Sequence, residues 1–281
     1  VLYVMYYLYG LFPPEDWQPD LEKFIAYFAF FAAIVGFTYL RFKGKAPRAA
    51  LWAEGALFVV VLAVVVYGWS GKWAVNGFGP PVADYGFMVV DATKMLFVEH
   101  ENPYSSQTIS PIRDTLGPEF RGYYYGPLTM IGYSPSLLWP VSGYKIAGVF
   151  YLLATAVLLG LLVWEPDDDP ALKFANIAFV LAAYFLPERM WVELFSRGAH
   201  DFMPTALVLG ALLAIKKNNF FAAGLLAGLS FSTKFAPALF LLPFLPIRRK
   251  NMWIGFALGL LPQVPFLLWD LQGFINNVYL V

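Results

Sequence analysis

Two aspartates, Asp84 and Asp91, are candidates for general-base catalysis, and their spacing allows both carboxylates to face the same space. They are seven residues apart, nearly two turns of an α-helix, so both carboxylates are predicted to lie on one helix face. A partly desolvated carboxylate can take a proton from a hydroxyl group as that hydroxyl attacks a substrate. The alternative for Asp84 is structural, because an acid in the first turn of a helix satisfies backbone N–H groups. For Asp91 the alternative is a solvated position on the helix surface.

Cationic side chains elsewhere in the chain are candidates for binding an anion, and phosphate in particular. These candidates are Arg189, Arg197 and Lys234. A planar guanidinium group or a lysine point charge suits phosphate oxygens. The alternative is that these side chains extend to a membrane interface or pair with nearby glutamates. Lys234 stands between apolar segments, where a charged side chain is costly and often functional.

His200, Asp201, Tyr104 and Tyr125 are the candidate substrate contacts. Tyr125 ends a run of three tyrosines, whose rings either stack on a sugar or lie in an interfacial aromatic belt. His200 and Asp201 together supply half of the ligands that a metal site needs. The chain has only two histidines and no cysteine, and it has no His-Glu-x-x-His spacing. We therefore predict neither a metal nor a cofactor.

The chain around these residues is far more apolar than a soluble protein. Of its 281 residues, 59% are hydrophobic and 14% are charged, against roughly 25% charged residues in soluble domains. The apolar runs match helices that cross a bilayer about 30 Å thick, and they lack the alternation of barrel strands. We predict an all-α, polytopic integral membrane protein with one transmembrane domain over residues 1–281. The net charge of zero predicts no nucleic-acid partner.

The positive-inside rule orients the predicted spans. Four cations within residues 41–48 place that loop in the cytoplasm. An outer loop over about residues 70–126 is then extracytoplasmic, with an amphipathic helix over Asp84–Val98 lying along the membrane surface. A second outer loop, residues 188–201, faces the same side. The predicted spans are Phe24–Leu40, Leu51–Trp69, Ile146–Trp164, Phe174–Pro187, Phe202–Ile215, Phe220–Phe231, Ala238–Ile247 and Met252–Trp269.

The segment Pro127–Pro140 is too short to span a bilayer and contains three prolines. If it enters the membrane and returns on the same side, Lys216, Lys217 and residues 248–250 all lie in the cytoplasm. Such a re-entrant segment is tolerated where protein or water covers its backbone. The chain starts at Val1 rather than methionine and ends in an apolar run, so we expect both ends to be truncated or processed.

The outer loop resembles the first outer loop of GT-C glycosyltransferases in the sequence DYGFMVVDATKMLFVEHENPYS, followed by YYYGPL. Residues 197–250 are similar to the polyprenol-phosphate-mannose-dependent mannosyltransferases of family GT87. The similarity lies in the order of a small loop, a span, a basic turn, AGLLAGL, Lys-x-x-Pro, another span and another basic turn. Together the two matches cover roughly Ala83 to Lys250.

The resemblance implies a membrane enzyme with a GT-C-like helical bundle. It would move a sugar, mannose being expected, from a polyprenyl phosphate carrier of the dolichyl phosphate type to a hydroxyl of a glycan or glycolipid. The reaction would invert the anomeric carbon on the extracytoplasmic face, without a metal. By motif, Asp84 corresponds to the catalytic aspartate of the family. The spacing from Asp84 to Tyr104 is about two residues long for the family, which keeps Asp91 as a rival base.

Two other classes of protein fit the composition. A transporter or lipid flippase usually has ionisable groups near the bilayer midplane and paired repeats. Here the charges gather at one predicted membrane face, and the sequence shows no convincing repeat. The third alternative is a non-catalytic membrane subunit, and the shortness of the chain for this family favours it.

Overall fold

The computed structural model describes residues 36, 48–74, 84–105, 123, 125–139, 143–185, 201–239, 241 and 249–279. Within those ranges the chain forms helices and turns and no strand, so the all-α prediction is confirmed there. The chain divides into two compact units. The first comprises residues 1–69 and 163–190, and the second comprises residues 70–162 and 191–281. The prediction of one transmembrane domain stays a prediction.

In the first unit, two apolar helices pack together along a stripe of small residues. Helix α3 extends over Arg48–Ala74, with its last residues in the second unit, and α8 extends over Pro170–Phe185. The fully buried Phe58 of α3 packs against Ala178 and Ala182 of α8. These alanines are four residues apart and therefore lie on one helix face, which leaves room for the phenylalanine ring.

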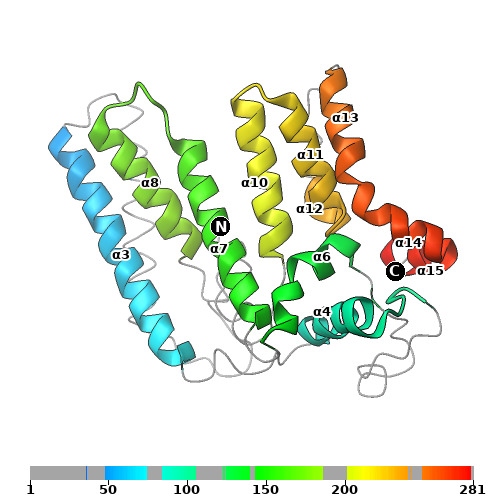
Figure 1. Cartoon of the computed structure of the whole chain (residues 1–281). Coiled ribbons are helices and arrows are strands. Elements are labelled where there is room, and N and C mark those ends of the chain that lie inside the picture. The colour runs from blue at the N-terminus through cyan, green and yellow to red at the C-terminus, as the bar shows by residue number, and fades with distance from the viewer. Residues whose placement is uncertain are drawn as a thin grey trace. The chain divides into compact units, whose positions relative to one another are not determined.

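The second unit contains the remaining helices and the candidate site (Figure 1). Its long elements are α7 (Gly143–Val163), α10 (Phe202–Lys216), α11 (Phe220–Phe231) and α13 (Lys250–Gly259). Its short elements are α4 (Asp84–Lys94), a π-helical turn (Met95–Glu99), α6 (Pro127–Gly132), a 3₁₀ turn (Ser134–Leu137), α12 (Phe235–Leu239), a 3₁₀ turn (Leu261–Gln263), α14 (Val264–Trp269) and α15 (Leu271–Val278).

Helices α11 and α13 approach each other closely because glycines face glycines. A Cβ atom added to Gly224 of α11 would lie 1.9 Å from the carbonyl oxygen of Met252, and one added to Gly255 of α13 would lie 2.2 Å from that of Phe221. Close backbone approach at small residues is the usual way in which apolar helices associate in a membrane. The glycines of this interface are Gly224, Gly228, Gly255 and Gly259.

Within the described residues, two helical segments are long and apolar enough to cross a membrane. They are Gly143–Val163 and Lys250–Trp269, and the second is interrupted by the 3₁₀ turn at Pro262. With 21 residues, the first is about 31 Å long, close to the thickness of the hydrocarbon core. Shorter apolar helices are Pro170–Phe185, Phe202–Lys216 and Phe220–Phe231.

Most predicted spans are helices in the structure, with ends shifted by a few residues. The predicted span Phe24–Leu40 lies outside the described residues, apart from helical Gly36, and so does most of Ala238–Ile247. The segment Pro127–Pro140 forms two short helical pieces, and its re-entrant path stays a prediction. Helix α15 was not predicted.

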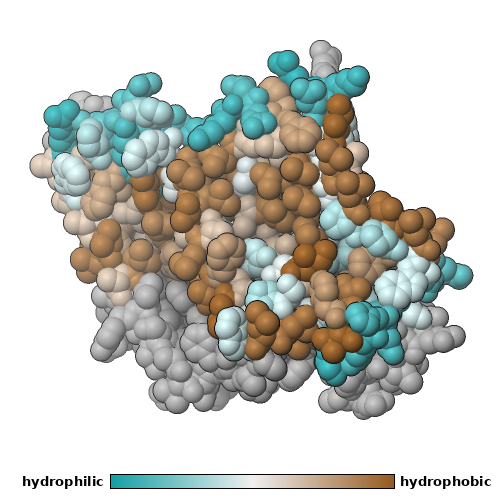
Figure 2. Space-filling model, in the orientation of Figure 1, coloured by the Kyte–Doolittle hydropathy of each residue, from teal (hydrophilic) through white to brown (hydrophobic). Residues whose placement is uncertain are grey.

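Basic residues gather at one end of the second unit. Lys216 ends α10 and Lys217 follows it, while Arg249 precedes α13 and Lys250 begins it. The ammonium of Lys216 donates to the carbonyl of Leu162 at the end of α7, 2.8 Å away. Figure 2 shows hydrophilic surface at this end and an apolar band over the helices beside it. These four basic residues therefore lie at the same end of the unit, as a re-entrant path of Pro127–Pro140 requires.

Candidate functional site

Asp84, the predicted general base, is the first residue of α4, and its side chain lies outside the described part of the structure. Asp91, the rival candidate for the general base, lies two turns later and is half-buried. Burial raises the pKa of the Asp91 carboxyl, the charge of Lys94 opposes this rise and the charge of Glu99 adds to it. Lys94 and Glu99 form an ion pair at 2.8 Å. Asp91 thus has the greater proton affinity that a general base benefits from.

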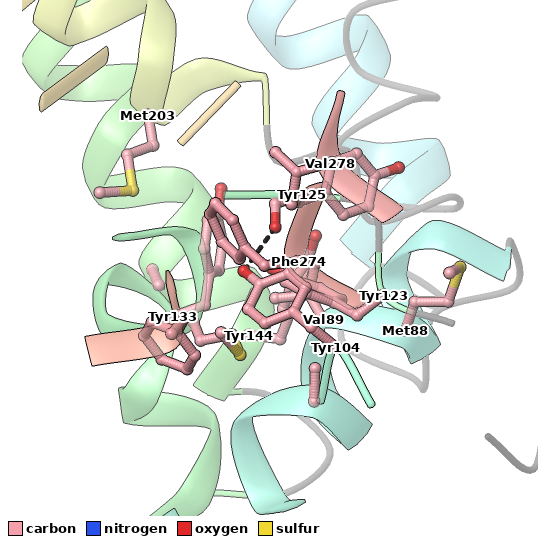
Figure 3. Close-up of a cluster of buried hydrophobic side chains, with 14 residues drawn as sticks. Met88, Val89, Tyr104, Tyr123, Tyr125, Tyr133, Tyr144, Met203, Phe274 and Val278 are labelled. Atoms are coloured by element: carbon pink, nitrogen blue, oxygen red, sulfur yellow. Dashed lines mark hydrogen bonds between the residues drawn. The ribbon is translucent and has the colours of Figure 1, made fainter. Parts of the chain in front are cut away.

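Helix α4 packs by its apolar face against the rest of the second unit. Met88, Val89 and Ala92 are buried in a cluster rich in aromatic rings (Figure 3). The other buried members of this cluster come from α6, α7, α10, α14, α15 and the segments between helices: Tyr104, Tyr123, Tyr125, Met130, Tyr133, Tyr144, Ala147, Met203, Phe266, Phe274 and Val278. The cluster fixes the helix that carries both candidate carboxylates.

The structure places Tyr104 at the centre of this cluster with no exposed surface. Its ring packs edge-on against Phe266 and Phe274, with centroids 5.3 and 4.8 Å away. Its hydroxyl donates to the backbone carbonyl of Tyr125 at 2.7 Å, as Figure 3 shows. Tyr104 therefore positions Tyr125 in this structure and presents no ring face to a sugar.

Two segments that are about 100 residues apart in sequence are joined by hydrogen bonds beside Tyr125. The amide of Gly126 donates to the carbonyl of Thr233 at 2.8 Å, and that of Leu128 donates to the carbonyl of Ser232 at 3.0 Å. The hydroxyl of Thr129 also donates to the Thr233 carbonyl, at 3.1 Å. Only glycine fits at position 126, because a Cβ atom there would lie 2.1 Å from the carbonyl oxygen of Ser232. The start of α6 thus fixes the turn that precedes Lys234.

A buried polar network supports the same turn from the other side. The Ser232 hydroxyl donates to the carbonyl of Gly259 at 2.9 Å and accepts from the side-chain amide of Gln263 at 3.2 Å. The side-chain carbonyl oxygen of Gln263 accepts a hydrogen bond from the hydroxyl of Tyr279 at 2.6 Å. Buried polar groups that are fully hydrogen-bonded favour one conformation. The network therefore links the 3₁₀ turn after α13 and the residue after α15 to the Lys234 turn.

Lys234 itself lies against two of the other predicted site residues. Its ammonium nitrogen is 2.7 Å from Oδ1 of Asp201 and 5.8 Å from the centroid of the Tyr125 ring. The Lys234 side chain is 35% exposed and that of Asp201 is 57% exposed. The structure thus brings together a predicted phosphate ligand and two predicted substrate contacts, at a place that solvent reaches.

Three further predicted site residues, Arg189, Arg197 and His200, lie outside the described residues. Within the part of the chain that the structure describes, no group of three potential metal ligands occurs. The absence of a metal and a cofactor stays a prediction.

Sequence reasoning did not single out Ser232, Gln263 or Tyr279. A signal for two of them exists in the spacing of the small residues. Gly224, Gly228 and Ser232 follow one another at intervals of four residues, and so do Gly255, Gly259 and Gln263. Four-residue spacing keeps side chains on one helix face. Each glycine stripe, continued by one interval, therefore predicts one member of the hydrogen-bonded pair Ser232 and Gln263.

Comparisons with known proteins give one match. The family model of glycosyltransferase family 87 matches residues 123–268, just over half of the chain. This range includes Tyr125, Asp201, Lys234 and Gln263, whereas α4 and α15 lie outside it. No curated protein and no solved structure matches the chain.

Proposed function

Because the chain belongs to glycosyltransferase family 87 and is therefore a membrane glycosyltransferase, we propose that it moves a hexose from a polyprenyl phosphate carrier to an acceptor hydroxyl. Mannose is the proposed sugar, and a glycan or glycolipid is the proposed acceptor. Membership of this family favours sugar transfer over the transporter and subunit alternatives. The enzyme is proposed to have the GT-C architecture, with several spans and the active site on the extracytoplasmic side.

The observation that carries this proposal is the position of Lys234. Its side chain is partly exposed to solvent, while the turn before it is fixed by hydrogen bonds to the start of α6 and to Gln263. A cation on a rigid support is what stabilisation of a developing negative charge requires. Helix α4, with its two candidate bases, packs against the same α6. The proposed base and the proposed phosphate ligand are therefore attached to one element.

The reaction is a single displacement at the anomeric carbon. The acceptor oxygen forms a bond to C1 while its proton passes to the carboxylate of Asp84, and the bond from C1 to the phosphate oxygen breaks. Its electron pair stays on that oxygen, so a phosphodiester with one negative charge becomes a phosphomonoester that carries nearly two at neutral pH. Attack opposite the leaving group inverts the anomeric centre.

The positive charges are assigned to the leaving phosphate. Lys234, with Arg189 or Arg197, is proposed to offset the extra negative charge on the polyprenyl phosphate. Asp91 is the rival base, and its half-buried position with a raised pKa supports that alternative. Tyr125 and His200 are proposed to lie at the sugar.

The sidedness of the site follows from the distribution of charge. Asp201 immediately precedes α10, and Lys217 immediately follows it. The two positions flank the 15 residues of α10 and are therefore roughly 24 Å apart along its axis. Since the basic end is expected in the cytoplasm, the end with Asp201 and Lys234 is proposed to face outward.

Transfer from a labelled donor tests this function. Purified protein in liposomes is incubated with labelled polyprenyl-phosphate mannose or with a labelled nucleotide-activated mannose, together with a glycolipid acceptor. We expect transfer from the lipid-linked donor only, and a product whose anomeric configuration is opposite to that of the donor. Lys234→Gln is expected to slow the transfer, and Lys217→Gln, at the other end of α10, is the matched control. Transfer from the nucleotide-activated donor alone contradicts the proposal.

A further inference from the structure

Lys234 already has an anionic partner at the place where a phosphate would bind. The carboxylate oxygen Oδ1 of Asp201 lies 2.7 Å from the ammonium nitrogen, a normal distance for a charged hydrogen bond. The ammonium has three N–H donors, and this carboxylate takes one of them. A donor phosphate that approaches Lys234 must therefore share the ammonium with Asp201 or displace it.

The backbones that carry the two charges are fixed by local hydrogen bonds. The amide of Lys234 donates to the carbonyl of Ser230 at 3.0 Å, and the preceding residue, Thr233, is bonded to the start of α6. The carbonyl of Asp201 accepts from both the amide and the hydroxyl of Thr205, at 3.1 and 2.6 Å. The ion pair can therefore open by rotation of side chains, without movement of α10 or α11.

Both partners are open to solvent, which makes the ion pair weak. The exposed fractions of 35% for Lys234 and 57% for Asp201 mean that water screens the attraction. The face of the Tyr125 ring, 5.8 Å from the ammonium, keeps the cation in place when the carboxylate leaves, since an aromatic face attracts a cation. A phosphate can thus replace the carboxylate without leaving Lys234 unsupported.

We propose that Asp201 is a displaceable counter-ion of Lys234, which occupies the phosphate position in the ligand-free enzyme and rotates away when the donor binds. The inference rests on the proposed function, in which Lys234 binds the donor phosphate. Exchange of one carboxylate for a phosphodiester with one negative charge leaves the local charge balance unchanged. After transfer the phosphomonoester is more negative, and Asp201 competes with it for Lys234, which favours release of the product. Asp201 is in this account a positioning residue.

Binding of the product lipid tests the inference. A short-chain polyprenyl phosphate is titrated into the purified full chain in detergent, with the uncharged polyprenol as the control ligand. The proteins are the wild type, Asp201→Asn, Lys234→Gln and the double variant, and Asp167→Asn is the matched charge control on an exposed loop. Thermal unfolding checks that each variant is folded, and Asp201→Ser is the second variant if Asp201→Asn is not.

We expect Asp201→Asn to lower the Kd of polyprenyl phosphate by about two- to fivefold, the range that an exposed ion pair allows. Lys234→Gln should raise this Kd, and in its presence the effect of Asp201→Asn should largely disappear, because the competition needs the ammonium. Asp167→Asn should have no effect, and no variant should alter binding of the polyprenol. A purely structural role for Asp201 predicts neither the tighter binding nor its dependence on Lys234.

Two results overturn the inference in different ways. If Lys234→Gln weakens binding but Asp201→Asn leaves it unchanged or weakens it, the counter-ion role is wrong while the phosphate role of Lys234 stands. If Lys234→Gln leaves binding unchanged, the assignment of Lys234 in the proposed function fails, and the counter-ion role fails with it.

Discussion

At the scale of single residues, Lys234 is the point at which the described parts of the site meet. Its ammonium contacts Asp201 from the start of α10 and faces the ring of Tyr125 from the segment before α6. Tyr125 is in turn positioned by the buried hydroxyl of Tyr104. The charge is thus exposed while the residues behind it are part of the core, which lowers the reorganisation needed when a phosphate binds.

Asp91 gives a pH-dependent prediction at this scale. Burial raises the pKa of its carboxyl above the ordinary 3.8, so the folded protein binds this proton more tightly than the unfolded chain. The contribution of Asp91 to stability is therefore fully present below pH 3.8 and is lost as pH rises through the raised pKa. Asp91→Asn should unfold at a higher temperature than the wild type at pH 7, and this difference should shrink toward pH 3.5. Thermal unfolding over a pH series measures it, and a variant less stable than the wild type at pH 7 contradicts the account.

Sequence analysis predicted some of these site residues but not the contacts that they make with one another. Lys234 could be predicted because a lone cation between apolar runs is unusual. Its pairing with Asp201, 33 residues away, could not, because it depends on how α10 and α11 pack. Tyr104 was predicted to contact the substrate, and in the structure it is buried between Phe266 and Phe274, whose helices sequence patterns could not bring together.

At the scale of elements, the glycine interface of α11 and α13 determines where the Lys234 turn lies. The stripe of Gly224 and Gly228 continues into Ser232, and the stripe of Gly255 and Gly259 continues into Gln263. The hydrogen bond between Ser232 and Gln263 therefore depends on the close approach of α11 and α13. Any substitution that moves α11 and α13 apart should also displace the Lys234 turn.

Gly228→Ala tests the importance of this interface. The added Cβ atom would lie 2.3 Å from the carbonyl oxygen of Phe256, so backbone must move, and overpacking of this kind costs about 1–3 kcal/mol. Gly210→Ala on α10 is the control, because its Cβ atom would meet only the flexible end of Leu226, 3.2 Å away. The free energy of unfolding in detergent should fall for Gly228→Ala and stay within about 1 kcal/mol of the wild type for Gly210→Ala. Equal stability of the two variants is the result that contradicts this view.

Long apolar helices were predictable from the sequence, and short amphipathic ones were harder to find. The runs that form α7, α10 and α11 are continuous and bounded by charges, so their existence was clear. Helix α15 mixes polar and apolar residues and was missed. One sequence feature does mark its start, since the carboxylate of Asp270 accepts from the amide of Gly273 at 2.8 Å as a helix cap.

At the scale of the whole molecule, the separation of charge within the second unit gives the protein a predicted orientation. Lys216, Lys217, Arg249 and Lys250 lie at the end where α10 meets α11 and α13 begins, where Figure 2 shows hydrophilic surface, and the Lys234 site lies at the other end of those helices. The positive-inside rule then predicts that the site lies outside the cytoplasm. A lipid-linked donor can reach such a site from the outer leaflet of the membrane.

Labelling of single cysteines tests this orientation directly, because these 281 residues contain no cysteine. Glu101→Cys and Lys217→Cys are both at exposed positions, beyond α4 and α10 respectively. A membrane-impermeant maleimide added to intact cells should label Glu101→Cys at once and Lys217→Cys only after permeabilisation. The reverse pattern would place the site on the cytoplasmic side and contradict the proposed topology.

The most direct measurement of the central claim is the rate of sugar transfer by Asp84→Asn, compared with Asp91→Asn, in purified protein supplied with labelled polyprenyl-phosphate mannose. Loss of a general base should lower kcat on the order of 10²- to 10⁴-fold, while binding of polyprenyl phosphate stays unchanged. The account predicts this loss for Asp84→Asn and a far smaller change for Asp91→Asn, and the opposite pattern would move the base to Asp91. Undiminished transfer in both variants would contradict the claim that a carboxylate of α4 is the base.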